Sequence, residues 1–190
     1  MWLKTKLQMR TYISILRGIN VSGQKIIKMD ALKRMYEKLN FENVQTYVQS
    51  GNVIFSVKET DTKVIEKIIL SQIEKEFGFD VPVIVLSAKT LETIIENNPF
   101  TKDNSKEPQF LHVTFLADNP AEFNKEKIVE KKQAGEEIAF TQNAVYLYCP
   151  NGYGNTKLNN NFLENKLKVK ATTRNWKTTN ELLRLATKII

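Results

Sequence analysis

Apolar residues in the first 86 positions alternate between the two-residue period of a strand and the three-to-four-residue period of a helix. Strand-like runs rich in β-branched and aromatic residues occur at 11–16, 44–49, 53–57 and 81–86, and helical spacing occurs at 29–39 and 61–77. The resulting order is strand, helix, strand, strand, helix, strand. This is the order of the split βαβ, or ferredoxin-like, plan.

The second predicted helix has a recognisable start and end. Asp61 is a natural N-cap, and Gly78 stands where a left-handed residue commonly ends a helix. Six apolar side chains at helical spacing are predicted to face the core, namely Val64, Ile65, Ile68, Ile69, Ile73 and Phe77.

The second half of the chain repeats this plan without obvious sequence identity to the first. Strands are predicted at 110–116, 137–141, 144–149 and 169–173, and helices from Asn119-Pro120 to about Lys132 and over 158–168. A capping box of Thr178 and Glu181 predicts a terminal helix. We therefore predict an α+β protein with two tandem ferredoxin-like (α/β plait) subdomains, antiparallel sheets and a C-terminal helix. The predicted parts are an N-terminal extension at 1–10, a first subdomain at 11–86, a linking helix and loop at 87–109, and a second subdomain with the terminal helix at 110–190.

The topology brings loops together that lie far apart in sequence. Because the crossover between the first two strands is right-handed, these strands run the same way and their following loops leave at one end of the sheet. Residues 17–25 are therefore expected beside 49–52, with the turn at 77–80 at the same end. In the second half, 150–155 is expected beside 174–176.

These loops are rich in residues that supply hydrogen bonds, cations and backbone freedom. Arg17 offers a planar fork for an anion, and exposed N–H groups near Gly18 and Gly23 offer an anion-binding nest. The predicted ligand-binding residues are Arg17, Gly18, Asn20, Gly23, Lys25, Gln49, Ser50, Gly51 and Asn52, together with Arg174, Asn175 and Trp176 from the second half. A nucleotide-hydrolase phosphate loop is not indicated, because Gln24 stands at its lysine position.

Each group also has a purely structural interpretation. Arg17 and Asn20 can tie the two loops together, and Gly51 with Asn52 is ordinary hairpin chemistry. Residues 174–176 can instead pin the terminal helix to the core.

Composition narrows the range of functions. The net charge is +7, but the lysines are dispersed and often alternate with glutamates, as on a solvated helix face. The only histidine, His112, and the only cysteine, Cys149, are interpreted as structural, and no spacing suggests a metal site. The single cysteine fits a reducing cytoplasm, and no apolar run is long enough to span a bilayer.

Several stretches together resemble the DUF1697 family of bacterial proteins of unknown function. They are Leu16-Arg17-Gly18-Ile19-Asn20-Val21 with Gly23, Lys28-Met29, 46–53 with Phe55, 77–83, Asn98-Pro99-Phe100 and 172–176. The resemblance implies two ferredoxin-like subdomains and brings no established activity. Two positions depart from the family pattern: Ser22 stands where Gly is usual, and Leu86 stands near where Arg is common.

The leading functional hypothesis is a cytoplasmic protein that binds a small anionic or phosphate-bearing ligand at the paired polar loops. Catalysis there would work by positioning and charge stabilisation, since the loops lack a natural general base. The alternatives are an RNA- or DNA-binding module and a protein-interaction or assembly domain. No cofactor, metal or membrane association is expected.

Overall fold

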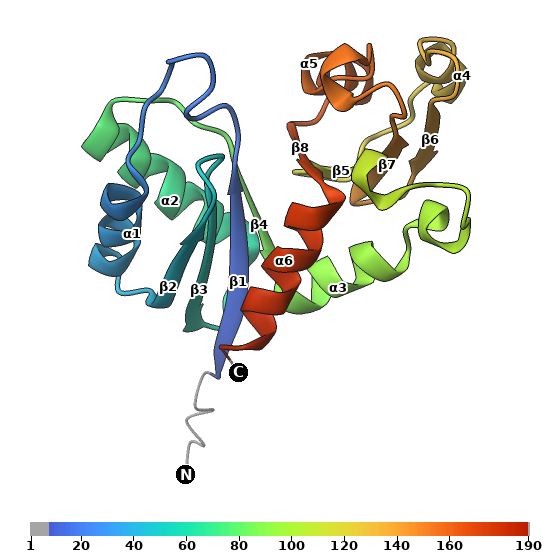
Figure 1. Cartoon of the computed structure of the whole chain (residues 1–190). Coiled ribbons are helices and arrows are strands. Elements are labelled where there is room, and N and C mark those ends of the chain that lie inside the picture. The colour runs from blue at the N-terminus through green and yellow to red at the C-terminus, as the bar shows by residue number, and fades with distance from the viewer. Residues whose placement is uncertain (1–7, 190) are drawn as a thin grey trace. The chain divides into compact units, whose positions relative to one another are not determined.

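The computed structural model describes residues 8–189 and divides the chain into two compact units (Figure 1). The first unit extends to Thr90 and includes the chain from Leu182 onward, and the second is Leu91–Glu181. The first seven residues of the expected N-terminal extension lie outside the described part. Met9 and Arg10 already belong to the first strand.

The first unit is the predicted ferredoxin-like subdomain. Its elements are β1 (Met9–Leu16), α1 (Met29–Lys38), β2 (Glu42–Tyr47), β3 (Asn52–Lys58), α2 (Thr62–Phe77) and β4 (Val83–Ser87). The antiparallel sheet has the order β2-β3-β1-β4, and Ile15 in β1 lies between Asn52 of β3 and Ile84 of β4. Figure 1 shows α1 and α2 on the same side of this sheet.

The second unit repeats the order. It contains β5 (Leu111–Leu116), α4 (Lys125–Val129), β6 (Glu137–Phe140), β7 (Ala144–Tyr148), α5 (Asn160–Leu167) and β8 (Ala171–Asn175), arranged as β6-β7-β5-β8. Helix α3 (Ala88–Glu96) comes before β5 in the chain, and α6 (Trp176–Thr187) follows β8 directly. The predicted α+β fold with two ferredoxin-like subdomains and a terminal helix is confirmed.

Three local predictions in the second half need correction. The helix expected from Asn119-Pro120 starts only at Lys125, because the Asn124 side chain accepts a hydrogen bond from the backbone N–H of Lys127 and caps it there. The last strand, predicted at 169–173, is Ala171–Asn175. Helix α6 starts two residues before the expected cap, because the Asn175 Oδ1 atom accepts the Thr178 N–H at 2.8 Å.

The core of the first unit forms between the helices and one face of the sheet. On α2, Ile65, Ile69 and Ile73 are buried as predicted, but Val64 and Ile68 are 47% and 42% exposed. Each precedes a buried isoleucine by one position, and a rotation of about 100° per residue turns it away from the sheet. The predicted caps of α2 are confirmed, since Asp61 accepts the Lys63 N–H and Gly78 is left-handed.

Candidate functional site

The loops that follow β1 and β2 meet as expected. The Leu16 N–H donates to the Gly51 carbonyl at 2.8 Å, and the Arg17 N–H donates to the Pro82 carbonyl at 2.9 Å. The β1–α1 loop, the β2–β3 turn and the segment entering β4 therefore share one end of the first sheet. We call residues 17–28, 48–51 and 78–82 the loop end.

Asn20 is the hydrogen-bonding centre of the loop end. Its Oδ1 atom accepts the Ile27 N–H at 2.8 Å, while its Nδ2 atom donates to the Ile27 carbonyl at 2.9 Å and the Gln49 carbonyl at 2.8 Å. The side chain thus closes the β1–α1 loop on itself and fastens it to the β2–β3 turn. This is the structural role weighed for Asn20 in the sequence, and we call these three bonds the Asn20 clamp.

Gly51 and Asn52 are built into the turn. Gly51 has φ +78°, and a Cβ atom there would lie 2.6 Å from Ile19 Cδ1. Asn52 is fully buried, and its Nδ2 atom donates to the Tyr47 carbonyl at 3.0 Å and to Ser50 Oγ at 3.1 Å. Both residues therefore stabilise the conformation of the turn and do not present a side chain to a ligand.

The tip of the β1–α1 loop is the exposed polar part of the loop end. Val21 and Gln24 form a β-bridge, so Ser22 and Gly23 lie at its turn with φ +50° and +73°. Ser22 thus takes the left-handed conformation, although it stands at the position where the resemblance noted in the sequence leads us to expect glycine. Within residues 8–189, the structure gives the N–H groups of Ser22 and Gly23 no protein acceptor.

All charged side chains of the β1–α1 loop are positive. Arg17, Lys25 and Lys28 are its charged residues, and no Asp or Glu occurs between 17 and 29. Lys25 is half-buried and its Nζ atom donates to the carbonyl of Asp80, whereas Lys28 is exposed at the N-cap of α1 and its side chain caps nothing. The site predicted from the sequence did not include Lys28. Its position directly before a predicted helix was the signal that could have indicated it.

Val48 in the β2–β3 turn is backbone-strained. This β-branched residue has φ +51° and is 46% exposed. The left-handed region costs a non-glycine residue about 1–2 kcal/mol, and asparagine tolerates it better. The strained residue is therefore one whose side chain contributes little to the core.

Replacing Val48 by asparagine is expected to raise the free energy of unfolding by about 1 kcal/mol, because the strain is relieved. Urea unfolding measures this change. Val64→Asn is the matched control, since Val64 is similarly exposed at 47% but helical, where the two residues have similar propensities. A loss of stability in Val48→Asn would show that the valine side chain supports the fold.

The predicted residues of the second unit lie around the start of α6. Arg174 is buried, its Nη1 atom donates to Thr172 Oγ1 at 3.0 Å and to the Thr173 carbonyl at 2.9 Å, and burial lowers its pKa to about 10. Asn175 caps α6, and the Trp176 carbonyl accepts a hydrogen bond from Asn180. These bonds fit the alternative in which 174–176 anchor the terminal helix.

The loop after β7 reaches β8, as the topology predicts. The Tyr153 hydroxyl donates to Thr173 Oγ1 at 3.0 Å, and its ring stacks on His112 with centroids 4.9 Å apart. The imidazole Nδ1 atom lies 3.1 Å from the Phe110 carbonyl, and burial lowers the His112 pKa. Cys149 is buried in the core, and burial raises its thiol pKa to about 12, so it is not an activated nucleophile.

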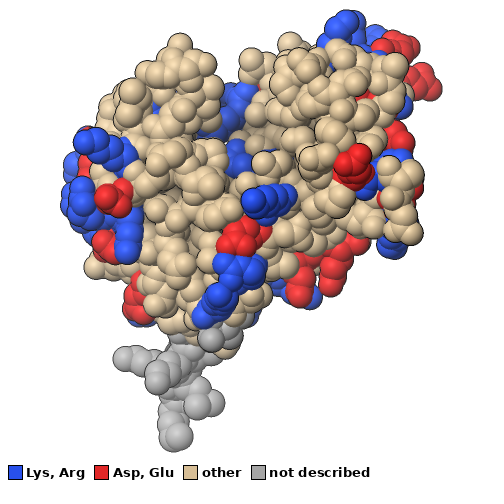
Figure 2. Space-filling model, viewed as in Figure 1, with Lys and Arg blue, Asp and Glu red and all other residues tan. Residues whose placement is uncertain are grey.

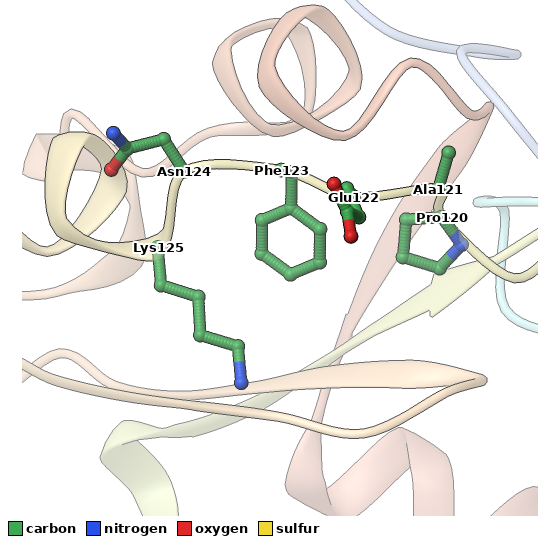
Figure 3. A pocket seen from close by; sticks show the side chains of 6 residues that line it. All are labelled: Pro120, Ala121, Glu122, Phe123, Asn124 and Lys125. Atoms are coloured by element: carbon green, nitrogen blue, oxygen red, sulfur yellow. The ribbon is translucent and has the colours of Figure 1, made fainter.

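The second unit also has a shallow hollow after β5, lined by residues 120–125 (Figure 3). Phe123 and Lys125 extend to the same side of this segment, and both side chains lie near the Phe140 ring. The hollow is made by one continuous stretch of chain. Among the described residues, no group of three or more His, Cys, Asp or Glu side chains is placed to hold a metal ion.

The fold and loop end define an α+β protein made of two ferredoxin-like subdomains, with a hydrogen-bonded loop cluster on the first. The family model described as "Protein of unknown function (DUF1697)" matches residues 9–146, so the chain belongs to the DUF1697 family. The conserved bacterial protein SP0830 from Streptococcus pneumoniae is 22% identical, with a TM-score of 0.69 over 94% of this chain and 99% of that one. At this identity the match shows the shared fold.

Comparison with curated proteins gave no match. Within the described part of the chain, no helix combines the length and the apolar character needed to cross a membrane.

Proposed function

We propose that the loop end of the first unit binds a small anionic or phosphate-bearing ligand. The observation that carries this proposal is the loop tip, where the exposed N–H groups of Ser22 and Gly23 have no acceptor within residues 8–189. Successive backbone N–H groups in left-handed or turn conformations are a common way to hold an anion.

The charges nearby favour the same ligand. Arg17, Lys25 and Lys28 belong to this loop without any intervening carboxylate. The N-terminus of α1, directly after Lys28, adds the positive end of a helix dipole. The groups of the β1–α1 loop and the β2–β3 turn are amides, hydroxyls and cations, which suits binding and charge stabilisation rather than proton transfer. The one carboxylate of the loop end, Asp80, lies in the segment that enters β4.

The nucleic-acid alternative receives less support. An RRM-like domain stacks bases on aromatic residues of its open sheet face. Here the face of the first sheet opposite α1 and α2 carries Ile13, Ile15 and Ile54, and all three are fully buried. On the face shown in Figure 2, Lys and Arg side chains around α1 are interspersed with Asp and Glu and do not form one continuous basic patch.

A thermal-shift screen with phosphate, nucleotides and sugar phosphates tests the proposal. We expect at least one of these ligands to raise the melting temperature, and Lys28→Ala and Arg17→Ala to weaken its binding about tenfold each, because each removes a charged partner. Lys33→Ala is the control, since Lys33 is a half-exposed cation on α1 with a 3.8 Å contact to Glu37. Equal losses in all three variants would mean that the ligand senses only overall charge, and the proposal would fail.

A further inference from the structure

Three exposed β-branched apolar residues gather at the loop end. Val21, Ile26 and Val48 are 57%, 64% and 46% exposed. Each is next in sequence to a residue held by the Asn20 clamp: Val21 follows Asn20, Ile26 precedes Ile27, and Val48 precedes Gln49. One set of hydrogen bonds therefore fixes all three in one region, and we call them the apolar triad.

The strain at Val48 indicates that the valine side chain serves a contact with another molecule. Glycine or asparagine would meet the backbone requirement at φ +51° with less strain. Because Val48 is about half exposed, its burial contributes no more than about the cost of the conformation. Backbone strain that brings no packing advantage is typical of functional positions.

The surroundings of the triad define the chemistry of its partner. Arg17, Lys25 and Lys28 belong to the same loop, which contains no Asp or Glu, and the one acidic residue of the loop end is the exposed Asp80 in the segment entering β4. A small anion alone would leave the apolar triad in water. A ligand that carries carboxylates together with apolar side chains would satisfy both kinds of group.

We propose that the anion bound at the loop end is presented by an acidic, apolar segment of a partner protein, which covers the apolar triad. This inference rests on the proposed anion binding and specifies its ligand. An anionic bilayer is less suited, because the loop tip that would enter it first is the polar pair Ser22-Gly23. A second copy of this chain is disfavoured by its own net charge of +7.

The test uses the fluorescently labelled peptide acetyl-Glu-Leu-Glu-Leu-Glu-amide and fluorescence polarisation with the full chain. We expect saturable binding that weakens about tenfold when Ile26→Ser and Val48→Asn are combined, as expected for loss of two apolar contacts. Val48→Asn relieves strain, so unfolding does not explain a loss. The control combines Val64→Ser and Ile68→Ser, because these α2 residues are likewise an exposed Val and Ile, at 47% and 42%.

Each other outcome overturns the inference. If the peptide with Gly in place of Leu binds equally well, anion binding stands but the apolar partner does not. If the peptide fails to bind at millimolar concentration while phosphate binds, the ligand is a small anion. Binding to vesicles containing phosphatidylserine in place of the peptide, or a concentration-dependent mass in light scattering that the triad variant abolishes, would identify a bilayer or a second copy as the occupant.

Discussion

Replacing Gly51 by alanine is expected to lower the free energy of unfolding by about 3 kcal/mol, which combines overpacking with left-handed strain. The new Cβ atom would lie 2.6 Å from Ile19 Cδ1 and 2.9 Å from Leu16 Cβ at a φ of +78°. Ile19 is 1% exposed and Leu16 is fully buried, so neither has room to move aside. Urea unfolding followed by circular dichroism measures the loss.

Gly23→Ala is the matched control for this change. Gly23 has nearly the same φ, +73°, but within the described residues no heavy atom beyond its two chain neighbours lies within 4 Å of a Cβ atom placed there. We expect a loss of about 1 kcal/mol, which represents the conformational cost alone. If both variants lost the same stability, close packing of the turn against the β1–α1 loop would not be what fixes the loop end.

Asn20→Ala is expected to cost about 3 kcal/mol, because it removes the three bonds of the clamp and leaves the partly buried N–H and carbonyl of Ile27 without these partners. The loop is then no longer fastened to the turn, so anion binding at the loop end should weaken as well. Chemical denaturation and phosphate titration of the same variant measure the two effects.

Asn43→Ala separates the clamp from backbone preference. Asn43 is also a left-handed asparagine, with φ +53°, but among residues 8–189 its side chain makes a single hydrogen bond, at 3.4 Å to Ser56 Oγ. We expect a loss about 2 kcal/mol smaller than that of Asn20→Ala, since two fewer hydrogen bonds disappear. Similar losses at both positions would mean that the clamp adds no stability beyond local conformation.

Much of the fold could be predicted from the sequence because two physical rules act without side-chain detail. Apolar periodicity separated the strands from α1 and α2, and the handedness of the crossover placed the β1–α1 loop beside the β2–β3 turn. The hydrogen bond from Leu16 to Gly51 confirms that placement. The errors arose where neighbouring signals compete, as at Asn124, which caps α4 later than Asn119-Pro120 suggested.

The division of roles within the site was less predictable. Arg17, Asn20, Gly51 and Asn52 stood together as ligand candidates, yet the structure uses Asn20 and Asn52 to hold the turn and the loop from within. The inward orientation of these amide side chains depends on several residues of the loop and the turn that have a positive φ. Only some of them are glycines, so the sequence did not mark the others. Val48 in a left-handed conformation could not be expected at all, since its side chain disfavours it.

The most direct test of anion binding at the loop end is a phosphate titration followed by ¹H–¹⁵N NMR. The proposed function predicts saturable shifts of the Ser22 and Gly23 amide signals, which Lys28→Ala weakens and Lys33→Ala leaves unchanged. Shifts spread over exposed lysines elsewhere, with Ser22 and Gly23 unmoved, would contradict it.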